Sequence, residues 1–405
     1  MKNIPVIIPY IDTDETNEVA MVLASGWVAQ GTKVAEFERQ VASYANVQYG
    51  IATTSCTTAL HLALIQMGVN ENHDVIVPSF TFTASSNSVL YTGGTPILVD
   101  VLPDTYNIDP VAIEALIASK YDVNMINKQT GKQLKAIMAV SLFGLCADLI
   151  AINEIAKKYS LLVLQDSACA FGAKINNVSE AAFGNMSCLS FHPRKSITTG
   201  EGGMVLTNDP EAAKRIMSLR SHGASVSEVD RHNSAGYLLP EFNELGYNYR
   251  MTDIQAAVGV AQMRKMEFIT NTRREKASFY DKLIKEMGVD FIKPPYVPGG
   301  YYHTYQSYVC VIDLGDIGLD NAGALRNEIM SDLEKNGIAS RVGTHANHML
   351  GHYRDRYGFK PEDFPVSHML DKLSITLPLY VQMTEQDQID VLQALLNAKT
   401  KLMGA

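Results

Sequence analysis

The stretch SFHPRKSITTGEGG, residues 190–203, contains the feature on which the interpretation of this chain depends. A basic pair, Arg194 and Lys195, follows an apolar run and precedes three glycines, which lead into a second apolar run, GGMVLTND. A lysine in this setting is a solvated loop charge, a phosphate ligand or a nucleophile. The apolar residues before it and the glycine turn after it favour a lysine held inside the protein. Schiff-base chemistry requires such an amine to have a lowered pKa.

Short apolar runs alternate with helical patterns on both sides of this stretch, from about residue 49 to about residue 220. The apolar runs are nearly continuous, which is typical of parallel strands covered on both faces. They are YGIATT, DVIVPSF, TPILVDV, LKAIMAVSLFG and LLVLQDSA, and the helical segments between them include TTALHLALIQMG, DPVAIEALIASK and ADLIAINEIAKKYS. This alternation predicts an α/β fold with a mostly parallel sheet.

A long helical pattern starts near Thr252 and runs to about Gly288. The tetrapeptide TDIQ at its start is a capping box, with Gln255 three residues after the N-cap Thr252. The length predicts one helix that joins two domains. The segments beyond it predict a small α+β domain, with the Pro/Gly-rich stretch 293–303 as a loop inside it or at its edge.

Together these patterns predict a large domain over residues 13–265 and a small C-terminal domain over residues 266–405. We expect residues 1–12 to pack on the small domain.

Composition narrows the classes of function. The chain has 405 residues and a formal net charge of −9, which argues against nucleic acid as a partner because phosphate-tracking surfaces are positive. No apolar run approaches the roughly 20 residues that span a bilayer, and Pro5 and Pro9 interrupt the N-terminal apolar patch. The five cysteines lack CxxC spacing, which favours reduced thiols in a cytoplasmic protein over a disulfide framework or a zinc site.

Three common cofactor or nucleophile motifs are absent from the sequence. No G-x-G-x-x-G follows a predicted strand, which argues against nicotinamide-dependent reduction. No Walker A motif occurs, since Lys195 precedes its glycines, and there is no G-x-S-x-G elbow.

Two further features lie upstream of Lys195. In SCTTALHLAL a strand is followed by a hydroxyl-rich turn and a helix near Thr57, so backbone N–H groups with the Ser55, Thr57 and Thr58 hydroxyls form a phosphate cradle or a plain N-cap. Asp166 ends a buried-type strand, where α/β folds place ligands. Burial disfavours its charge, so a cationic partner is expected, and an N-cap or a loop ion pair is the alternative.

The order of these features matters. A phosphate turn, then a strand-end aspartate, then a lysine some thirty residues later match the needs of pyridoxal 5'-phosphate (PLP). This cofactor needs a phosphate cradle, an acid on its pyridine nitrogen and a lysine that forms a Schiff base. We therefore predict a PLP site.

Seven collinear motifs resemble those of the DegT/DnrJ/EryC1/StrS family of sugar aminotransferases, and they cover nearly the whole chain. They are SGWVAQGTKVAEFE, SCTTALHLAL, VPSFTFTASSNSV, QDSACAFGA, SFHPRKSITTGEGGMV, GYNYRMTDIQAAVG and SITLPLYVQMT. The resemblance implies a fold-type-I, aspartate aminotransferase-like PLP enzyme. Such an enzyme has a three-layer α/β/α large domain with a mostly parallel sheet and a smaller C-terminal α+β domain. It works as a homodimer with two shared active sites.

The resemblance also implies a reaction. The amino group of L-glutamate moves to a keto-deoxysugar nucleotide, and the resulting aminosugar nucleotide enters glycan or natural-product biosynthesis. Within this family pattern, Lys195 matches the Schiff-base lysine, Asp166 the partner of the pyridine nitrogen, and Phe82 the aromatic residue that stacks on the ring. The matched phosphate-binding positions are Cys56, Thr57, Ser190 and, from the partner subunit, Asn248.

Two positions depart from the family pattern. Cys169 stands where Gln or His commonly contacts the ring hydroxyl, and a thiol donates only weakly. Cys56 stands where Gly is common in the phosphate turn, although its backbone amide can still serve. The presence of Lys195 disfavours the deoxygenating branch of the family, in which histidine replaces this lysine.

Several other polar residues have open roles. His345, His348 and His352 would share a face if helical, but no acid or cysteine joins them at ligand spacing, so we predict no metal site. His345 is a candidate for substrate contact, and Trp27 lines the sugar site or belongs to the core.

Four further residues have structural alternatives. Arg194 meets a substrate phosphate or is simply exposed, and His192 is expected to be structural. For Arg250 and Asp253, a structural pair near the subunit interface is as good an interpretation as a functional role.

Two alternatives to amino transfer remain at this stage. One is PLP-dependent elimination from a nucleotide sugar, and the other is a non-catalytic PLP- or sugar-binding protein. Consumption of glutamate separates amino transfer from elimination, which does not need the amino donor stoichiometrically.

Overall fold

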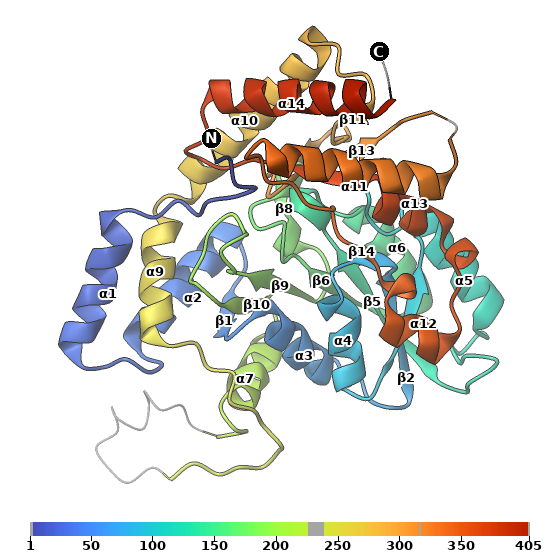
Figure 1. Cartoon of the computed structure of the whole chain (residues 1–405). Helices are drawn as coiled ribbons and strands as arrows, with labels where there is room; N and C mark the ends of the chain where they lie inside the picture. Colours follow the sequence, from blue (N-terminus) through green and yellow to red (C-terminus); the bar gives the residue numbers. More distant parts are fainter. Residues whose placement is uncertain (1–2, 226–238, 316, 404–405) are drawn as a thin grey trace.

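The structure is a computed structural model that describes residues 3–225, 239–315 and 317–403. A seven-stranded sheet with strand order β1-β10-β9-β6-β5-β2-β4 lies at its centre (Figure 1). Six of its strands point in the same direction, and β10, which pairs antiparallel with both β1 and β9, points in the opposite one. The strands are β1 (Tyr49–Thr53), β2 (His73–Pro78), β4 (Thr95–Val99), β5 (Gln133–Val140), β6 (Leu162–Asp166), β9 (Met186–Ser190) and β10 (Gly203–Thr207). The mostly parallel sheet predicted from the sequence is confirmed.

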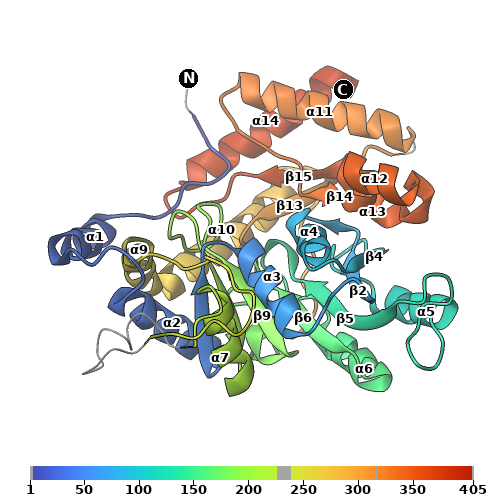
Figure 2. The same cartoon turned by 90° about the horizontal axis from the view of Figure 1, so that it is seen from below.

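Helices cover both faces of this sheet, which makes the predicted three layers (Figures 1 and 2). The alternation of side chains along a strand explains why the strands are apolar throughout. Val75 and Val77 of β2 pack in the core that contains α3, whereas Ile76 packs with α5 and α6 on the other face. The helices of this part are α1 (Thr13–Ser25), α2 (Thr32–Ala45), α3 (Cys56–Gln66), α4 (Ala84–Tyr91), α5 (Pro110–Lys120), α6 (Leu149–Tyr159), α7 (Pro210–Leu219) and α9 (Asp253–Met263).

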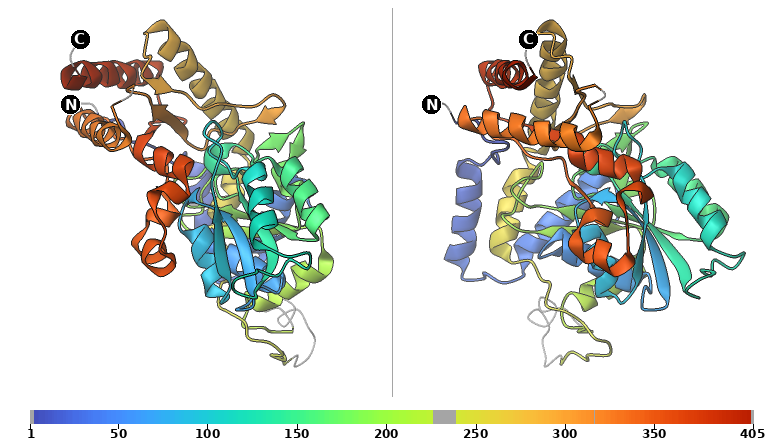
Figure 3. Two further views of the ribbon diagram at one scale, coloured as in Figure 1. Left: turned by 90° about the vertical axis from the view of Figure 1, so that its right-hand side faces the viewer. Right: turned by 45° about the vertical axis from the view of Figure 1, so that its right-hand side comes forward.

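A second, antiparallel sheet with strand order β11-β13-β15 stands above the first in Figure 1. Its helices pack over a separate core, to which Ile4 also belongs. The amide of Leu379 donates to the carbonyl of Val6, and Figure 3 shows the N-terminal segment running beside α11 and α14. The elements are β11 (Ile292–Lys293), β13 (Tyr308–Ile312), β15 (Ser374–Leu377), α10 (Met266–Glu286), α11 (Leu319–Lys335), α12 (Gly351–Tyr357), α13 (Pro365–Leu373) and α14 (Glu385–Met403). These contacts support our proposal that residues 1–12 pack on a small domain beginning at residue 266.

Two short pairings connect distant segments. β14 (His345–Ala346) pairs with β3 (Phe80–Thr81), and β12 (Tyr301–Tyr302) pairs with β7 (Lys174–Ile175), which also pairs with β8 (Val178–Ser179). The Pro/Gly-rich stretch 293–303 therefore ends in a strand, β12, that pairs with β7, the strand that comes after β6 in the sequence. Within the described ranges, no helix is long and apolar enough to cross a membrane.

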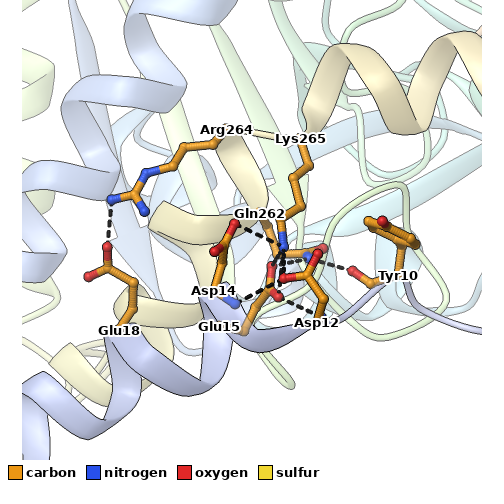
Figure 4. A network of polar contacts seen from close by, with 8 residues as sticks. All are labelled: Tyr10, Asp12, Asp14, Glu15, Glu18, Gln262, Arg264 and Lys265. Carbon is orange, nitrogen blue, oxygen red and sulfur yellow. Dashed lines mark hydrogen bonds and ion pairs between the residues drawn. The ribbon is translucent and has the colours of Figure 1, made fainter.

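The expectation of one helix from Thr252 to Gly288 is wrong in one respect. The predicted capping box of Thr252 and Gln255 is present, but the helix breaks at Lys265, where φ is −106° and ψ is −1°, and continues as α10. Charged side chains at the break are held by the N-terminal segment (Figure 4). Arg264 pairs with Glu18 at 2.5 Å, and Lys265 pairs with Glu15 at 2.9 Å. These contacts hold the end of α9 against α1. After the break, α10 continues toward the second sheet.

A buried acid lies beneath the carboxyl end of β6. Glu180 is fully buried, and one of its carboxyl oxygens accepts hydrogen bonds from Ser167 at 2.8 Å and from Ser187 at 3.2 Å. Its other oxygen has no partner among the described residues. Burial raises the pKa of Glu180 to about 8, and the two serine hydroxyls only partly offset this effect.

We predict that Glu180→Gln makes the protein more stable than the wild type at pH 8, by about 2–4 kcal/mol. The raised pKa means that the contribution of Glu180 to stability is greatest below about pH 4.5, where the unfolded acid ionises, and is lost as the pH rises to about 8. The neutral amide removes this loss. Chemical denaturation of the protein from pH 5 to pH 9 measures the difference, and a constant gap between the two proteins over that range would contradict the buried, protonated acid.

Candidate active site

A cavity of about 800 Å³ lies between the carboxyl ends of the large-sheet strands and the second sheet. Its walls come from both parts of the chain, with Thr57, Phe82, Asp166 and Lys195 on one side and Arg341 and His345 on the other. A cavity at the carboxyl ends of parallel strands is the usual position of a ligand site in α/β folds.

Lys195 enters this cavity from the loop between β9 and β10. The loop is folded tightly: the amide of Lys195 donates to the carbonyl of His192 at 2.8 Å, and that of Thr199 donates to the carbonyl of Phe191 at 3.0 Å. Gly200 adopts φ +82°, a conformation that side chains disfavour. Lys195 is half-buried, and its Nζ donates to Cys169 Sγ at 3.1 Å.

The pKa of the Lys195 amine differs from the sequence-based expectation. Burial lowers this pKa, but the nearby Cys169, Cys56 and Asp166 favour the charged amine and together raise the pKa above its ordinary value. The lowered pKa expected for a free nucleophilic amine is therefore not found. The Cys169 sulfur that accepts from the amine and the nearby Asp166 carboxylate outweigh the effect of burial.

Asp166 is the last residue of β6 and is 5% exposed. One carboxyl oxygen accepts a hydrogen bond from Ser85 Oγ at 2.7 Å, and the other accepts one from the amide of Ala168 at 3.1 Å. Burial raises the pKa of Asp166, although these hydrogen bonds and Lys195 act against it. No ion pair to Asp166 occurs among the described residues. The loop ion pair considered as an alternative is thus not found.

The hydroxyl-rich turn begins α3 at Cys56. Ser55 is its N-cap, and the side chains of Ser55 and Thr58 form a capping box, so these two hydroxyls serve the helix, as the alternative interpretation held. The amides of Cys56 and Thr57 occupy the first turn, where no intrahelical acceptor exists, and both residues line the cavity. Anions bind at such helix N-termini.

The remaining predicted cofactor residues also lie around the cavity. Phe82, between β3 and α4, lines it and is 59% exposed, and half-buried Ser190 lines it at the end of β9. The Cys56 thiol lies 3.9 Å from Asp166 Oδ1. Burial raises the pKa of Cys56 well above its ordinary value, which keeps the thiol neutral.

These residues fit PLP. Asp166 is a buried carboxylate with no cation in direct contact, and a protonated pyridine nitrogen would supply that charge. The N-terminus of α3 would accept the phosphate, and the Lys195 amine faces the same cavity.

Some predicted residues lie elsewhere. Asn248 is exposed, and its backbone bridges to Ser221 outside the cavity. Trp27 does not line the cavity, and its Nε1 donates to the carbonyl of Gln30 at 3.0 Å.

The interpretation of Arg250 and Asp253 as a structural pair is not supported by the contacts of Asp253. Asp253 instead accepts from the amides of Gly31 and Val34 at 2.7 and 3.0 Å, because α2 begins at a glycine that offers no capping side chain.

The three histidines do not share a helical face. His345 lies in β14 and lines the cavity, whereas buried His348 bonds Ser79 at 2.7 Å and His352 lies in α12. The three are separated because the chain changes from strand to 3-10 helix to α-helix over this segment. In the part of the chain that the structure describes, no group of three His, Cys, Asp or Glu residues could hold a metal ion.

Sequence reasoning missed three residues of the site. Ser85 contacts Asp166 from α4, and Gln306 and Arg341 line the cavity. Ser85 is one of several small polar residues in TASSNS, and Arg341 is a lone arginine in ASRVG, so no local pattern distinguishes either residue.

The chain belongs to the DegT/DnrJ/EryC1/StrS aminotransferase family, whose model matches residues 9–396. It is therefore a PLP-dependent sugar aminotransferase with the fold-type-I architecture. Among its relatives is the GDP-perosamine synthase of Caulobacter vibrioides, which is 34% identical over 98% of both chains.

Two solved structures illustrate the fold. PseC of Helicobacter pylori, an aminotransferase involved in pseudoaminic acid biosynthesis, superposes with a TM-score of 0.86 at 25% identity, covering 99% of this chain and 100% of that one. Spr1654 of Streptococcus pneumoniae, solved in a PLP form, gives a TM-score of 0.87 at 25% identity, again over 99% and 100% of the two chains.

We predict that Gly203→Ala destabilises the protein by at least about 2 kcal/mol and weakens PLP binding. A Cβ at this position would lie 2.3 Å from the carbonyl of Ser55 and 2.5 Å from the amide of Cys56, so the N-terminus of α3 would have to move. Gly299→Ala, where a Cβ has no neighbour within 4 Å, is the matched control. Thermal unfolding and PLP titration of both variants test this, and equal behaviour of the two would contradict the close contact.

Proposed function

We propose that the protein transfers the amino group of L-glutamate to the keto group of a nucleotide-linked deoxysugar. The observation that carries this proposal is the convergence of the Lys195 amine, the buried Asp166 carboxylate and the N-terminus of α3 on one cavity. The relationship to GDP-perosamine synthase and PseC supports a nucleotide sugar as the amino acceptor.

In this proposal each side chain has one task. When bound, the cofactor's protonated ring takes up the electron pair released at the substrate carbon. Lys195 Nζ carries the cofactor and then moves the proton to and from the substrate carbon. Asp166 holds the proton on the pyridine nitrogen, and Ser85 orients Asp166. Phe82, which lines the cavity, would cover one face of the ring.

The other cofactor contacts involve the phosphate and the ring hydroxyl. Ser190 and the amides of Cys56 and Thr57 bind the phosphate. Cys169, which accepts a hydrogen bond from Lys195 Nζ, would be the neighbour of the ring hydroxyl.

A homodimer with shared sites belongs to the same proposal. Asn248 is exposed and lies outside the cavity of its own chain, which fits a residue that reaches the phosphate of the partner subunit. Exposed apolar side chains on and after α1 would be covered in such a dimer; they are Met21, Leu23, Trp27 and Val28. We place the reaction in the cytoplasm, where the five cysteines, all free in the structure, stay reduced.

The first test is the absorbance of the purified, PLP-loaded protein before and after L-glutamate is added alone. Amino transfer predicts a visible band that disappears as a near-ultraviolet band of the aminated cofactor grows, with release of 2-oxoglutarate. A visible band that L-glutamate leaves unchanged would reject this donor and favour elimination.

We predict that Lys195→Ala lowers the rate of the glutamate half-reaction by at least about 1,000-fold, because it removes the proton carrier. Asp166→Asn should lower it by about 100-fold, since a neutral amide does not keep the ring nitrogen protonated. Asp104→Asn, at an exposed carboxylate that is not part of the cavity lining, is the matched control. Single-turnover absorbance kinetics measure all three, and an Asp166→Asn rate equal to that of the control would remove Asp166 from the reaction.

A further inference from the structure

Two arginine side chains line the cavity without partners. Arg194 comes from the loop after β9, and Arg341 comes from the segment between α11 and β14. Neither guanidinium makes a hydrogen bond or an ion pair with the described residues, in contrast to Arg220, which pairs with Glu38 at 2.5 Å. Two unpaired cations that face one cavity are suited to an anionic ligand.

The backbone of both arginines is held in place. Gln306 Nε2 donates to the carbonyl of Arg194 at 2.6 Å, and the Arg194 amide donates to His192 Nδ1 at 3.1 Å. Arg341 forms an antiparallel bridge with Thr376, whose amide donates to the Arg341 carbonyl at 2.6 Å. The side chains are therefore free to bind while their attachment points stay fixed, one on each side of the cavity.

The electrostatic environment of His192 shows that the two arginines act on the same region. Burial lowers the pKa of His192, and the positive charges of Arg194, Lys195 and Arg341 lower it further. Glu201 is the acid that faces this group, 3.9 Å from His192 Nε2, and it raises the pKa. The region is positive although the chain as a whole carries a net charge of −9.

Both substrates of the proposed function carry an anion a few bonds away from the reacting carbon. In L-glutamate it is the distal carboxylate, and in the nucleotide sugar it is the diphosphate. Guanidinium groups bind both carboxylate and phosphate oxygens through paired hydrogen bonds. Arg194 directly precedes Lys195, and both line the same cavity as Arg341, so a substrate whose carbon lies at Lys195 Nζ occupies the cavity that both arginines face.

We propose that Arg194 and Arg341 form one anion subsite, which binds the distal carboxylate of the amino donor in one half-reaction and the diphosphate of the sugar nucleotide in the other. This inference rests on the proposed function and adds to it the group that both substrates share. The two substrates then exclude each other from the cavity, as successive occupation of one cofactor requires.

Calorimetric titration of the PLP-loaded protein tests the subsite without turnover. Glutarate and inorganic pyrophosphate are the probes, because neither carries an amino group, a sugar or a base. We expect each probe to bind and to displace the other. Arg194→Gln and Arg341→Gln should each weaken both probes by about tenfold or more while the cofactor absorbance stays unchanged. Arg356→Gln, on α12 outside the cavity lining, is the matched control.

Three outcomes would overturn the inference. They are simultaneous binding of the two probes, loss of only one probe in both arginine variants, and wild-type affinity for both probes in either variant. The proposed function is tested separately by the response to L-glutamate. A wild-type protein that binds both probes competitively but does not react with L-glutamate would reject that function and leave the anion subsite in place.

Discussion

The site is organised around a carboxylate buried at the end of a parallel strand without a cation beside it. Burial raises the pKa of Asp166, and hydrogen bonds from Ser85 and the Ala168 amide only partly stabilise its charge. A buried carboxylate of this kind destabilises the protein unless a ligand supplies a compensating positive charge. Lys195 and the N-terminus of α3 line the same cavity as Asp166. Together the three define where a cofactor with a cationic ring and a phosphate group fits.

Two parts of the chain must meet for this cavity to exist. Helix α10 connects them, and buried Arg273 on this helix donates to the carbonyls of Tyr305 and Gln306. Burial lowers the pKa of Arg273 to about 10, still well above neutral, so it stays charged. Gln306 in turn bonds the Arg194 carbonyl, next to Lys195. This series of contacts fixes the loop that carries Lys195 relative to α10 and the second sheet. The ion pairs of Lys265 fix the start of α10.

The sequence predicted those features that local patterns encode. Apolar runs and helical periods define the strands and helices, and the strand end and glycine turn locate Asp166 and Lys195. Features that depend on contacts between distant segments escaped prediction. Ser85 lies 81 residues from Asp166, and Asp253 caps a helix more than 200 residues away. The break at Lys265 is likewise set by carboxylates near the N-terminus, which no pattern within the helix reveals.

The central claim is that Lys195, among all lysines of the chain, carries the cofactor in the cavity completed by Asp166. Borohydride reduction of the PLP-loaded protein, followed by peptide mass mapping, tests it most directly, because reduction fixes the cofactor to the amine that holds it. We expect one pyridoxyl group per chain, on the peptide that contains Lys195. Labelling of a different lysine, with Lys195 unmodified, would contradict the account.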